Sequence, residues 1–464
     1  MSEQYRTTPE ETDKMPSGIP FIVGNEAAER FSYYGMTGIL MTFMTTHLLV
    51  ANARGETSHM TEAQATSVIH YFKSVNYFFP FLGAIIADAI TGKYLMIVSL
   101  SLVYCLGHAV LFLMDFPVGI EAQYLLYAGL GLIALGAGGI KSCVSAHVGD
   151  QFGSKNQHLL EKVYMWFYFS INLGAGVSLY LCPELLERYG PGVAFGVPGL
   201  LMAAATLVFW LGRKRYAHIP ASREKFVSAL DRDGLFAIVR MIPLYFFVAV
   251  FWALWDQSAS RWVSQAANLN RTLFTIPWGE TSWSFTLLPA QVQVVNAIFV
   301  LAMIPLFATL VYPAINKVFR LTPLRKVGIG LFIMIPVFVI IAWLQTRIDN
   351  KETPHVYWQI LAYAFLTASE VLISITALEF SYTQAPASLK SVVMGVNLLS
   401  VTVGNFFVGM VNSYVSRMEE LKTPVLQGAS YYWFFVGCIA VAAVLYVPWA
   451  VTYRGRTQLQ SEAT

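Results

Sequence analysis

The feature that most constrains this chain is the repetition of apolar segments long enough to cross a bilayer. A membrane-spanning helix needs about 20 mostly apolar residues, and twelve segments meet that length. They cover residues 20–50, 64–90, 94–115, 122–148, 162–182, 192–212, 236–262, 288–316, 324–345, 356–384, 390–416 and 429–453. Hydrophobic residues make up 56% of the chain and charged residues 12%, whereas soluble domains have about 25% charged residues. We therefore predict an all-α membrane protein with twelve transmembrane helices.

The longest polar joint between these segments, residues 212–233, contains six Lys and Arg residues and divides the helices into six plus six. Loops rich in Lys and Arg stay in the cytoplasm, so we expect the joint and both termini there. The predicted order is a cytoplasmic tail (1–18), a six-helix bundle (19–212), a cytoplasmic linker (213–234), a second six-helix bundle (235–453) and a cytoplasmic tail (454–464). Major facilitator transporters have this 6+6 architecture, with the substrate site at mid-membrane between the halves.

Net charge and cysteine usage exclude several classes of partner. The net charge is +3, which is close to neutral and indicates no nucleic-acid partner. The four cysteines lie in apolar segments without a CxxC pair, so buried packing is favoured over a disulfide or a metal site. No nucleophile or metal cluster is apparent, and we expect neither an enzyme nor a cofactor.

Three charged residues interrupt the first apolar segment. Glu26, Glu29 and Arg30 are spaced i, i+3 and i+4, so they share one face of a helix. A charge at the bilayer centre costs a few kcal/mol or more and needs a polar cavity with partners. This cluster favours a pathway for a solute and protons. The alternative is a structural salt-bridge network that holds helices together.

The motif around these charges resembles one from the proton-coupled oligopeptide transporters. Residues 26–34 match the pattern E-x-x-E-R-F-x-Y-Y of that family. Five further blocks resemble the family in the same order: 83–94, 138–145, 167–174, 251–262 and 370–386. The residues in these blocks are similar to those of the animal peptide transporters. The loop from Thr346 to Pro354, however, is short where the animal proteins carry a large outer domain. The resemblance thus indicates a bacterial member of animal-like type.

The resemblance implies a site that holds both ends of a short peptide. Arg30 and Lys141 match the positions that bind the peptide carboxylate, which suits a forked guanidinium. Glu370, Asn172 and Asn296 match the positions that bind the amino end. The implied pocket wall is aromatic and comprises Tyr33, Tyr34, Tyr77, Tyr168 and Trp252. The alternatives are an ion pair of Lys141 with Glu26 or Glu29, and helix–helix hydrogen bonds for the two asparagines.

The resemblance also implies a set of proton-coupling residues. His70 matches the essential histidine of the animal transporters, and histidine titrates near neutral pH. Asp256 is the second candidate, because moving between an apolar site and a cation would change its affinity for a proton. Glu26 and Glu29, tied to Arg30 and Lys141, form the third titrating element.

One departure from the family affects the peptide carboxylate. Many relatives carry Arg where this chain has Thr37. Lys73 shares a helical face with His70 and Tyr77, and we infer that it compensates for the missing cation. In the alternative, Lys73 points elsewhere and snorkels to a boundary.

These observations and the resemblance predict a proton-coupled symporter that imports di- and tripeptides by alternating access and functions as a monomer in the cell inner membrane. A first alternative keeps transport but changes the solute, since plant relatives carry nitrate and other anions. A second alternative is a peptide-sensing receptor with little transport.

Overall fold

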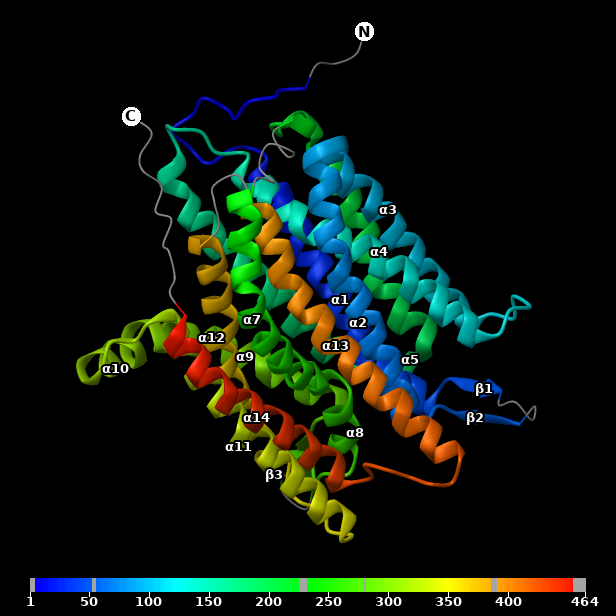
Figure 1. Ribbon diagram of the computed structural model, residues 1–464. Coiled ribbons are helices and arrows are strands. Elements are labelled where there is room, and N and C mark those ends of the chain that lie inside the picture. The colour runs from blue at the N-terminus through cyan, green and yellow to red at the C-terminus, as the bar shows by residue number, and fades with distance from the viewer. Residues whose placement is uncertain (1–4, 52–55, 225–231, 279–280, 385–389, 454–464) are drawn as a thin grey trace.

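The computed structural model describes residues 5–51, 56–224, 232–278, 281–384 and 390–453. The predicted tail 454–464, and the part of the predicted linker at 225–231, lie outside the described residues. The first half contains α1 (Ile19–Thr46), α2 (Glu62–Ile86), α3 (Lys93–Phe112), α4 (Ala122–Gly149) and α5 (Leu160–Leu211). The second half contains α7 (Arg232–Trp255), α8 (Arg261–Ala267), α9 (Val294–Leu306), α10 (Tyr312–Val318), α11 (Pro323–Asp349), α12 (Tyr357–Gln384), α13 (Lys390–Glu420) and α14 (Ala429–Thr452). Figure 1 shows the long helices packed side by side in two groups.

The described helices account for the twelve predicted spans. Ten of them are long and apolar enough to cross a membrane, and the 28-residue α1 is a further long helix. The 52-residue α5 contains two spans, because its backbone breaks at Gly190, where φ is 82°. Both parts of α5 flank α1, since a Cβ added at Gly35 would meet Cys182 and Pro198. The predicted boundary between residues 182 and 192 is thus a sharp helical reversal and not a loop.

Each half has its own hydrophobic core. Buried side chains of α1, α2, α3, α4 and α5 form most of one cluster, and those of α7, α11, α12 and α14 form most of the other. The halves meet most closely where α2 packs along α13. There Ser74 donates to the Thr402 carbonyl at 3.0 Å, and a Cβ on Gly395 would lie 3.0 Å from the Phe81 ring.

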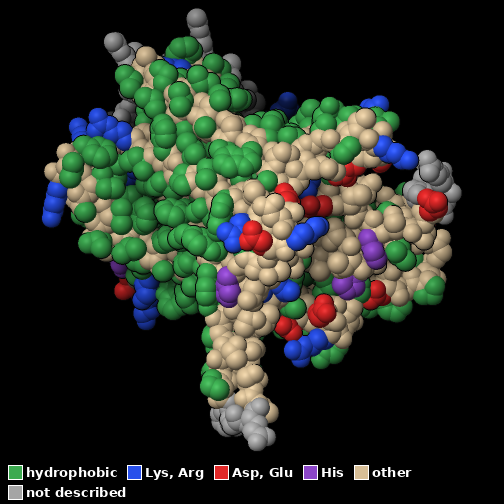
Figure 2. All heavy atoms as spheres, turned by 90° about the horizontal axis from the view of Figure 1, so that it is seen from below, with side chains coloured by type: hydrophobic (Ala, Val, Ile, Leu, Met, Phe, Trp, Pro, Cys, Tyr) green, Lys and Arg blue, Asp and Glu red, His purple; other side chains and the backbone are tan. Residues whose placement is uncertain are grey.

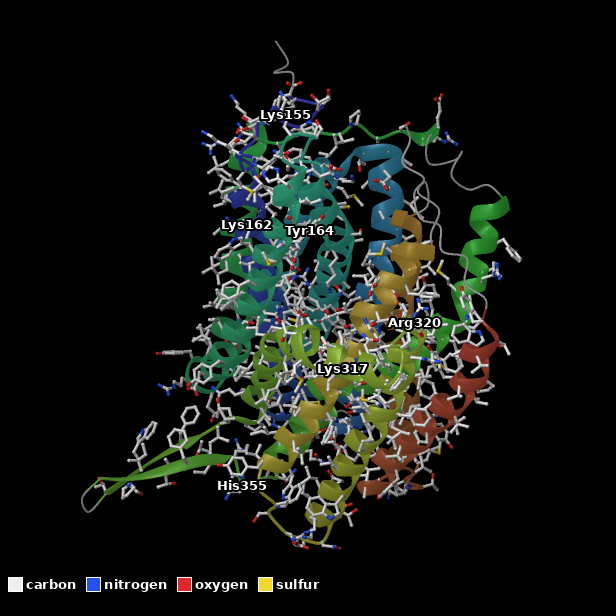
Figure 3. The ribbon with its side chains drawn as sticks, turned by 90° about the vertical axis from the view of Figure 1, so that its left-hand side faces the viewer. Lys155, Lys162, Tyr164, Lys317, Arg320 and His355 are labelled. Atoms are coloured by element: carbon white, nitrogen blue, oxygen red, sulfur yellow. The ribbon has the colours of Figure 1, made fainter. Side chains whose placement is uncertain are left out.

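Two β-hairpins lie outside the helices, although the sequence analysis expected no strands. β1 (Leu49–Ala51) pairs with β2 (Thr57–His59). β3 (Thr272–Trp278) pairs with β4 (Thr281–Thr286) and joins α8 to the segment before α9. In Figure 3 the β3–β4 hairpin projects sideways from the helical body, near the level of His355.

Close contact between α2 and α4 depends on glycine. A Cβ added at Gly138 would lie 2.4 Å from the Asn76 carbonyl oxygen, and one at Gly83 would lie 2.7 Å from the Gly139 carbonyl oxygen. Backbone atoms cannot yield as a flexible side-chain end can. The sequence therefore fixes the spacing of these two helices by leaving out side chains.

We predict that Gly138→Ala lowers the thermal stability of the purified protein, because overpacking costs about 1–3 kcal/mol. The matched control is Gly131→Ala on the same helix, where an added Cβ meets nothing within 4 Å. That change should leave the melting temperature unchanged or raise it, since alanine favours helix over glycine by about 0.5–1 kcal/mol. Equal melting temperatures for the two variants would contradict the packing argument.

Candidate functional site

The charges of α1 form a compact buried group. Arg30 Nε donates to Glu26 Oε1 at 2.7 Å, and Glu29 Oε2 lies 2.7 Å from the same nitrogen. All three residues are buried. Each carboxylate thus shares one guanidinium, as the i, i+3 and i+4 spacing predicts.

Lys141 on α4 occupies an aromatic site. Its Nζ lies 4.4 Å from the centre of the Tyr33 ring and 4.1 Å from that of Tyr77, within the range of a cation–π interaction. The nitrogen has no hydrogen-bond partner among the described residues. The expected ion pair with Glu26 or Glu29 is therefore not formed as a direct contact, because the two tyrosine faces hold the ammonium. Its three N–H groups can still donate to a ligand.

A second buried network connects the two halves. Lys73 Nζ on α2 donates to Asp256 Oδ1 at 2.6 Å, and Asn405 Nδ2 on α13 donates to Asp256 Oδ2 at 2.7 Å. The other end of that amide, Asn405 Oδ1, lies 2.7 Å from His70 Nδ1, and His70 Nε2 lies 2.9 Å from Ser260 Oγ. Because the amide oxygen can only accept, His70 Nδ1 donates to Asn405 Oδ1. Both predicted proton-coupling residues, His70 and Asp256, therefore bind the same asparagine.

Glu370 on α12 is held by neutral donors. Trp255 Nε1 and Asn296 Nδ2 both donate to Glu370 Oε2 at 2.9 Å, and Asn296 also donates to Thr367 at 3.0 Å. No cation of the described part of the chain lies within ion-pair distance of Glu370. The predicted pairing of Glu370 with Asn296 in one polar site is thus present in the geometry.

A small cavity of about 50 Å³ lies between these groups. Its lining comprises Tyr33, Tyr34, Thr37, Lys73, Tyr77, Leu179, Trp255, Asp256, Ser258, Ala259, Gln293, Asn296 and Tyr363. Ligand pockets usually measure about 300–1,000 Å³, so a peptide could enter this space only after the surrounding helices move apart. Lys73 lines the cavity as inferred, but its ammonium pairs with Asp256 and not with the charges of α1.

Four residues of the predicted pocket wall or amino-end site do not line this cavity: Glu370, Asn172, Tyr168 and Trp252. Asn172 donates to the Tyr168 carbonyl within α5 at 2.9 Å and lines a groove between α5 and α9. Tyr168 is 40% exposed. Trp252 packs with its ring centre 5.3 Å from that of Trp255, and Trp255, one helical turn further on, takes the cavity position. The helix–helix hydrogen bond considered for Asn172 is replaced by a bond within its own helix.

The halves are locked together on the side opposite to the termini. Arg261 on α8 pairs with Glu62 at the start of α2, with 2.8 Å between Nη1 and Oε2, and it donates to Asn412 at 2.7 Å. Gln291 donates to Glu184 Oε1 at 3.1 Å and to the Tyr180 carbonyl at 3.0 Å. In Figure 3 His355 marks this side, and Lys155 and Lys162 mark the side of the N-terminus. The cavity is therefore sealed on the His355 side.

Sequence reasoning missed several polar partners of the site. Asn405, Ser260 and Trp255 contact the predicted residues directly. Asn405 and Ser260 are common residue types in apolar spans, and nothing in the local pattern indicates which ones face the cavity. Trp255 lies inside the matched block 251–262, three residues after Trp252, and residues at this spacing share one helical face, so a helical-face argument could not choose between the two.

Comparison with known proteins identifies the family of this chain. The profile of PTR2, the POT family, matches residues 94–232 and 230–434. The chain belongs to the POT family. Among its relatives, human solute carrier family 15 member 2 is 36% identical over 381 residues, covering 72% of this chain and 50% of the relative. The Drosophila melanogaster protein named peptide transporter family 1 is 33% identical over 384 residues, covering 73% of this chain and 49% of the relative. This POT family chain thus spans about half the length of the curated relatives it matches.

Solved structures of POT family proteins agree with the fold. The in meso crystal structure of the POT family transporter PepTSo has a TM-score of 0.80 at 34% identity and covers 95% of this chain and 99% of its own. An auto-inhibited POT family peptide transporter has a TM-score of 0.81 at 32% identity, covering 96% and 99%. These likenesses confirm the predicted 6+6 major facilitator fold, and the chain is a multi-pass membrane protein. The names are those of transporters, in agreement with the expectation that the chain is not an enzyme.

The buried pair between the halves makes a testable prediction for this POT family chain. Removing one member of a buried ion pair typically costs about 3–5 kcal/mol, because the other charge stays buried without a partner. Lys73→Met and Asp256→Asn should each lower the melting temperature in detergent. The double variant should lose less than the sum of the two single losses.

The matched control is the half-buried pair of Lys93 and Asp150, which are 2.8 Å apart on the side of the N-terminus. Lys93→Met and Asp150→Asn should have smaller effects, because water solvates the remaining charge. Additive losses for Lys73 and Asp256 would show that their contact does not stabilise the closed arrangement.

Proposed function

We propose that the protein is a proton-coupled symporter that imports di- and tripeptides by alternating access. One observation carries this proposal: an acid and a base near the same cavity are each held by neutral groups. Glu370 binds Asn296 and Trp255, and Lys141 lies between two tyrosine rings. A zwitterion brings one counter-charge for each of them. A peptide carries these charges at its two ends, with a variable middle.

The aromatic wall suits the variable middle of such a solute. Tyr33, Tyr34 and Tyr77 line the cavity and offer apolar faces with polar tips. In the proposed binding mode the carboxylate end faces Lys141 and Arg30, and the ammonium end faces Glu370. Lys73 supplies a further cation at the cavity wall, in place of the arginine that many relatives carry at the position of Thr37.

Protons enter the proposal through the network between the halves. Asp256 and Lys73 form an ion pair with 2.6 Å between Oδ1 and Nζ. A proton on Asp256 would remove that attraction and weaken the contact of α2 with the second half. His70, held to Asp256 through Asn405, can receive or pass that proton only by exchanging its hydrogen-bond partners. Glu26, Glu29 and Arg30 supply the third titrating group. Release of the network would free the sealed side to open, which is the step that alternating access requires.

The names of several relatives support a peptide as the solute, among them peptide transporter family 1 and an auto-inhibited POT family peptide transporter. We further propose that the protein acts as a monomer in the cell inner membrane, with both termini in the cytoplasm. Lys and Arg residues gather on the side of the termini, which supports that orientation. In this orientation the sealed side faces outward.

Uptake into proteoliposomes tests the function directly. Labelled dialanine should accumulate above its outside concentration when an inward proton gradient is imposed, and only equilibrate when the gradient is collapsed. Nitrate should not compete for uptake. Accumulation without any proton gradient would contradict the coupling, and binding without accumulation would favour a receptor.

A substitution at Glu370 tests how the amino end is held. Glu370→Gln should weaken binding of free dialanine by about tenfold or more, because a charge-assisted hydrogen bond of about 1.5–3 kcal/mol is lost. Binding of N-acetyl-dialanine, which has no ammonium group, should change far less. The control is Glu379→Gln on the same helix, since Glu379 is exposed and lines a groove away from the cavity.

Isothermal titration of the detergent-purified variants measures both peptides. A matched loss for the free and the acetylated peptide would show that Glu370 acts through the structure of the site and not through the peptide amine.

A further inference from the structure

The β3–β4 hairpin has two chemically different faces. Phe274 pairs with Phe285, and Ile276 pairs with Trp283, so these four side chains share one face. The rings of Phe274, Trp283 and Phe285 lie with centres 5.5–6.2 Å apart. On the opposite face the Thr275 and Ser284 hydroxyls are 2.9 Å apart. One face is therefore aromatic and the other is built from hydroxyl groups.

A bulge in β3 keeps this division along the strand. The register shifts between Thr272 and Phe274, so Leu273 is an extra residue that packs against the hydrophobic core of the second half. Thr272 consequently points to the hydroxyl face, where its Oγ1 lies 2.9 Å from Thr286 Oγ1. If Leu273 instead kept the regular alternation of the strand, Thr272 would lie on the aromatic face with Phe274.

The hairpin is fixed at its root and uncovered along its length. At the root, Arg271 donates to the Leu287 carbonyl at 2.7 Å, and Asn270 exchanges backbone hydrogen bonds with Pro354 and Val356. Further along, Phe274, Ile276 and Trp283 are 49%, 47% and 55% exposed. A two-stranded hairpin is marginally stable alone in water, and its aromatic face needs a covering.

The surrounding surface identifies the covering as lipid. The root lies next to the starts of α9 and α12, where the apolar side chains of Ile298, Leu301, Trp358 and Leu361 are exposed. The hairpin also extends sideways and not along the helices (Figure 3). Seven residues of strand reach about 23 Å, so the hairpin covers bilayer surface beside the protein.

The orientation of the two faces agrees with this placement. Figure 2 looks at the molecule from the side on which the hairpin emerges, and backbone and polar side chains of the hairpin face the viewer. Green side chains appear on it mainly along one edge, so the face turned to the viewer is not the aromatic one. The described strands of the hairpin carry no Lys, Arg, Asp or Glu. Trp and other amphipathic rings favour the membrane–water boundary.

We propose that the β3–β4 hairpin is a membrane-interface anchor, whose aromatic face lies on the acyl boundary of the leaflet on the His355 side. The contact is apolar, so it requires no particular lipid headgroup. It holds the second half at a fixed depth beside the sealed side of the cavity.

Spin labels on neighbouring residues of opposite faces test this proposal. Cys105, Cys143, Cys182 and Cys438 are first replaced by Ala in the full-length chain, and a nitroxide is attached at Trp283→Cys or at Ser284→Cys. In phosphatidylcholine vesicles, the label at 283 should collide with oxygen more often than with a water-soluble nickel chelate. The label at 284 should show the reverse preference. Ile276→Cys should resemble 283, and Thr275→Cys should resemble 284.

The other occupants of this face give different results. Equal access of the nickel chelate to 283 and 284 would show a hairpin in water and overturn the proposal. A label at 283 that is shielded from both reagents, with spin–spin broadening, would show a second copy of the chain on this face and would also overturn it. Elution of each labelled variant as the unlabelled protein in size-exclusion chromatography confirms that it is folded. Because the proposed contact is apolar, adding anionic lipid to the vesicles should not change the oxygen accessibility of the label at 283.

Discussion

The ion pair between Lys73 and Asp256 is the interaction on which the rest of the central structure depends. Two charges 2.6 Å apart attract strongly in a dry interior, but each one has lost its water. That loss is offset only while α2, α13 and the segment after α7 stay together. Asn405 completes the shell of Asp256 and orients His70. The pair therefore stabilises one relative position of the two halves. Any position that separates the charges before water reaches them costs free energy.

The charges beside the cavity follow a different rule from the charges between the halves. Lys73 and Asp256 neutralise each other, and Arg30 is shared by two carboxylates. Lys141 and Glu370 instead have tyrosine rings, an amide and an indole around them. Under the proposed function, Lys141 and Glu370 are the charges that a solute can pair with directly, whereas Arg30 and Lys73 already have carboxylate partners in the described state.

Much of this arrangement follows from the sequence because membrane helices obey strong constraints. Apolar length predicts the spans, and the spacing of Glu26, Glu29 and Arg30 predicts their shared guanidinium. The location of Lys141 between two rings did not follow, since a cation selects a carboxylate or an aromatic face according to distances that no local pattern encodes. Asn405 lies 335 residues from its partner His70, and only the packing of α13 on α2 brings them together. The β3–β4 hairpin could have been predicted, because apolar residues alternate on both sides of Gly279 and Glu280.

The continuous α5 has a consequence for how the chain enters the membrane. Its two spans are joined by a reversal at Gly190 with almost no polar connection, and the Gly192 amide is capped by Asp115 from the connection between α3 and α4. The two spans therefore have little chain between them with which to adjust their relative position. We expect them to enter the bilayer together, as one helical hairpin.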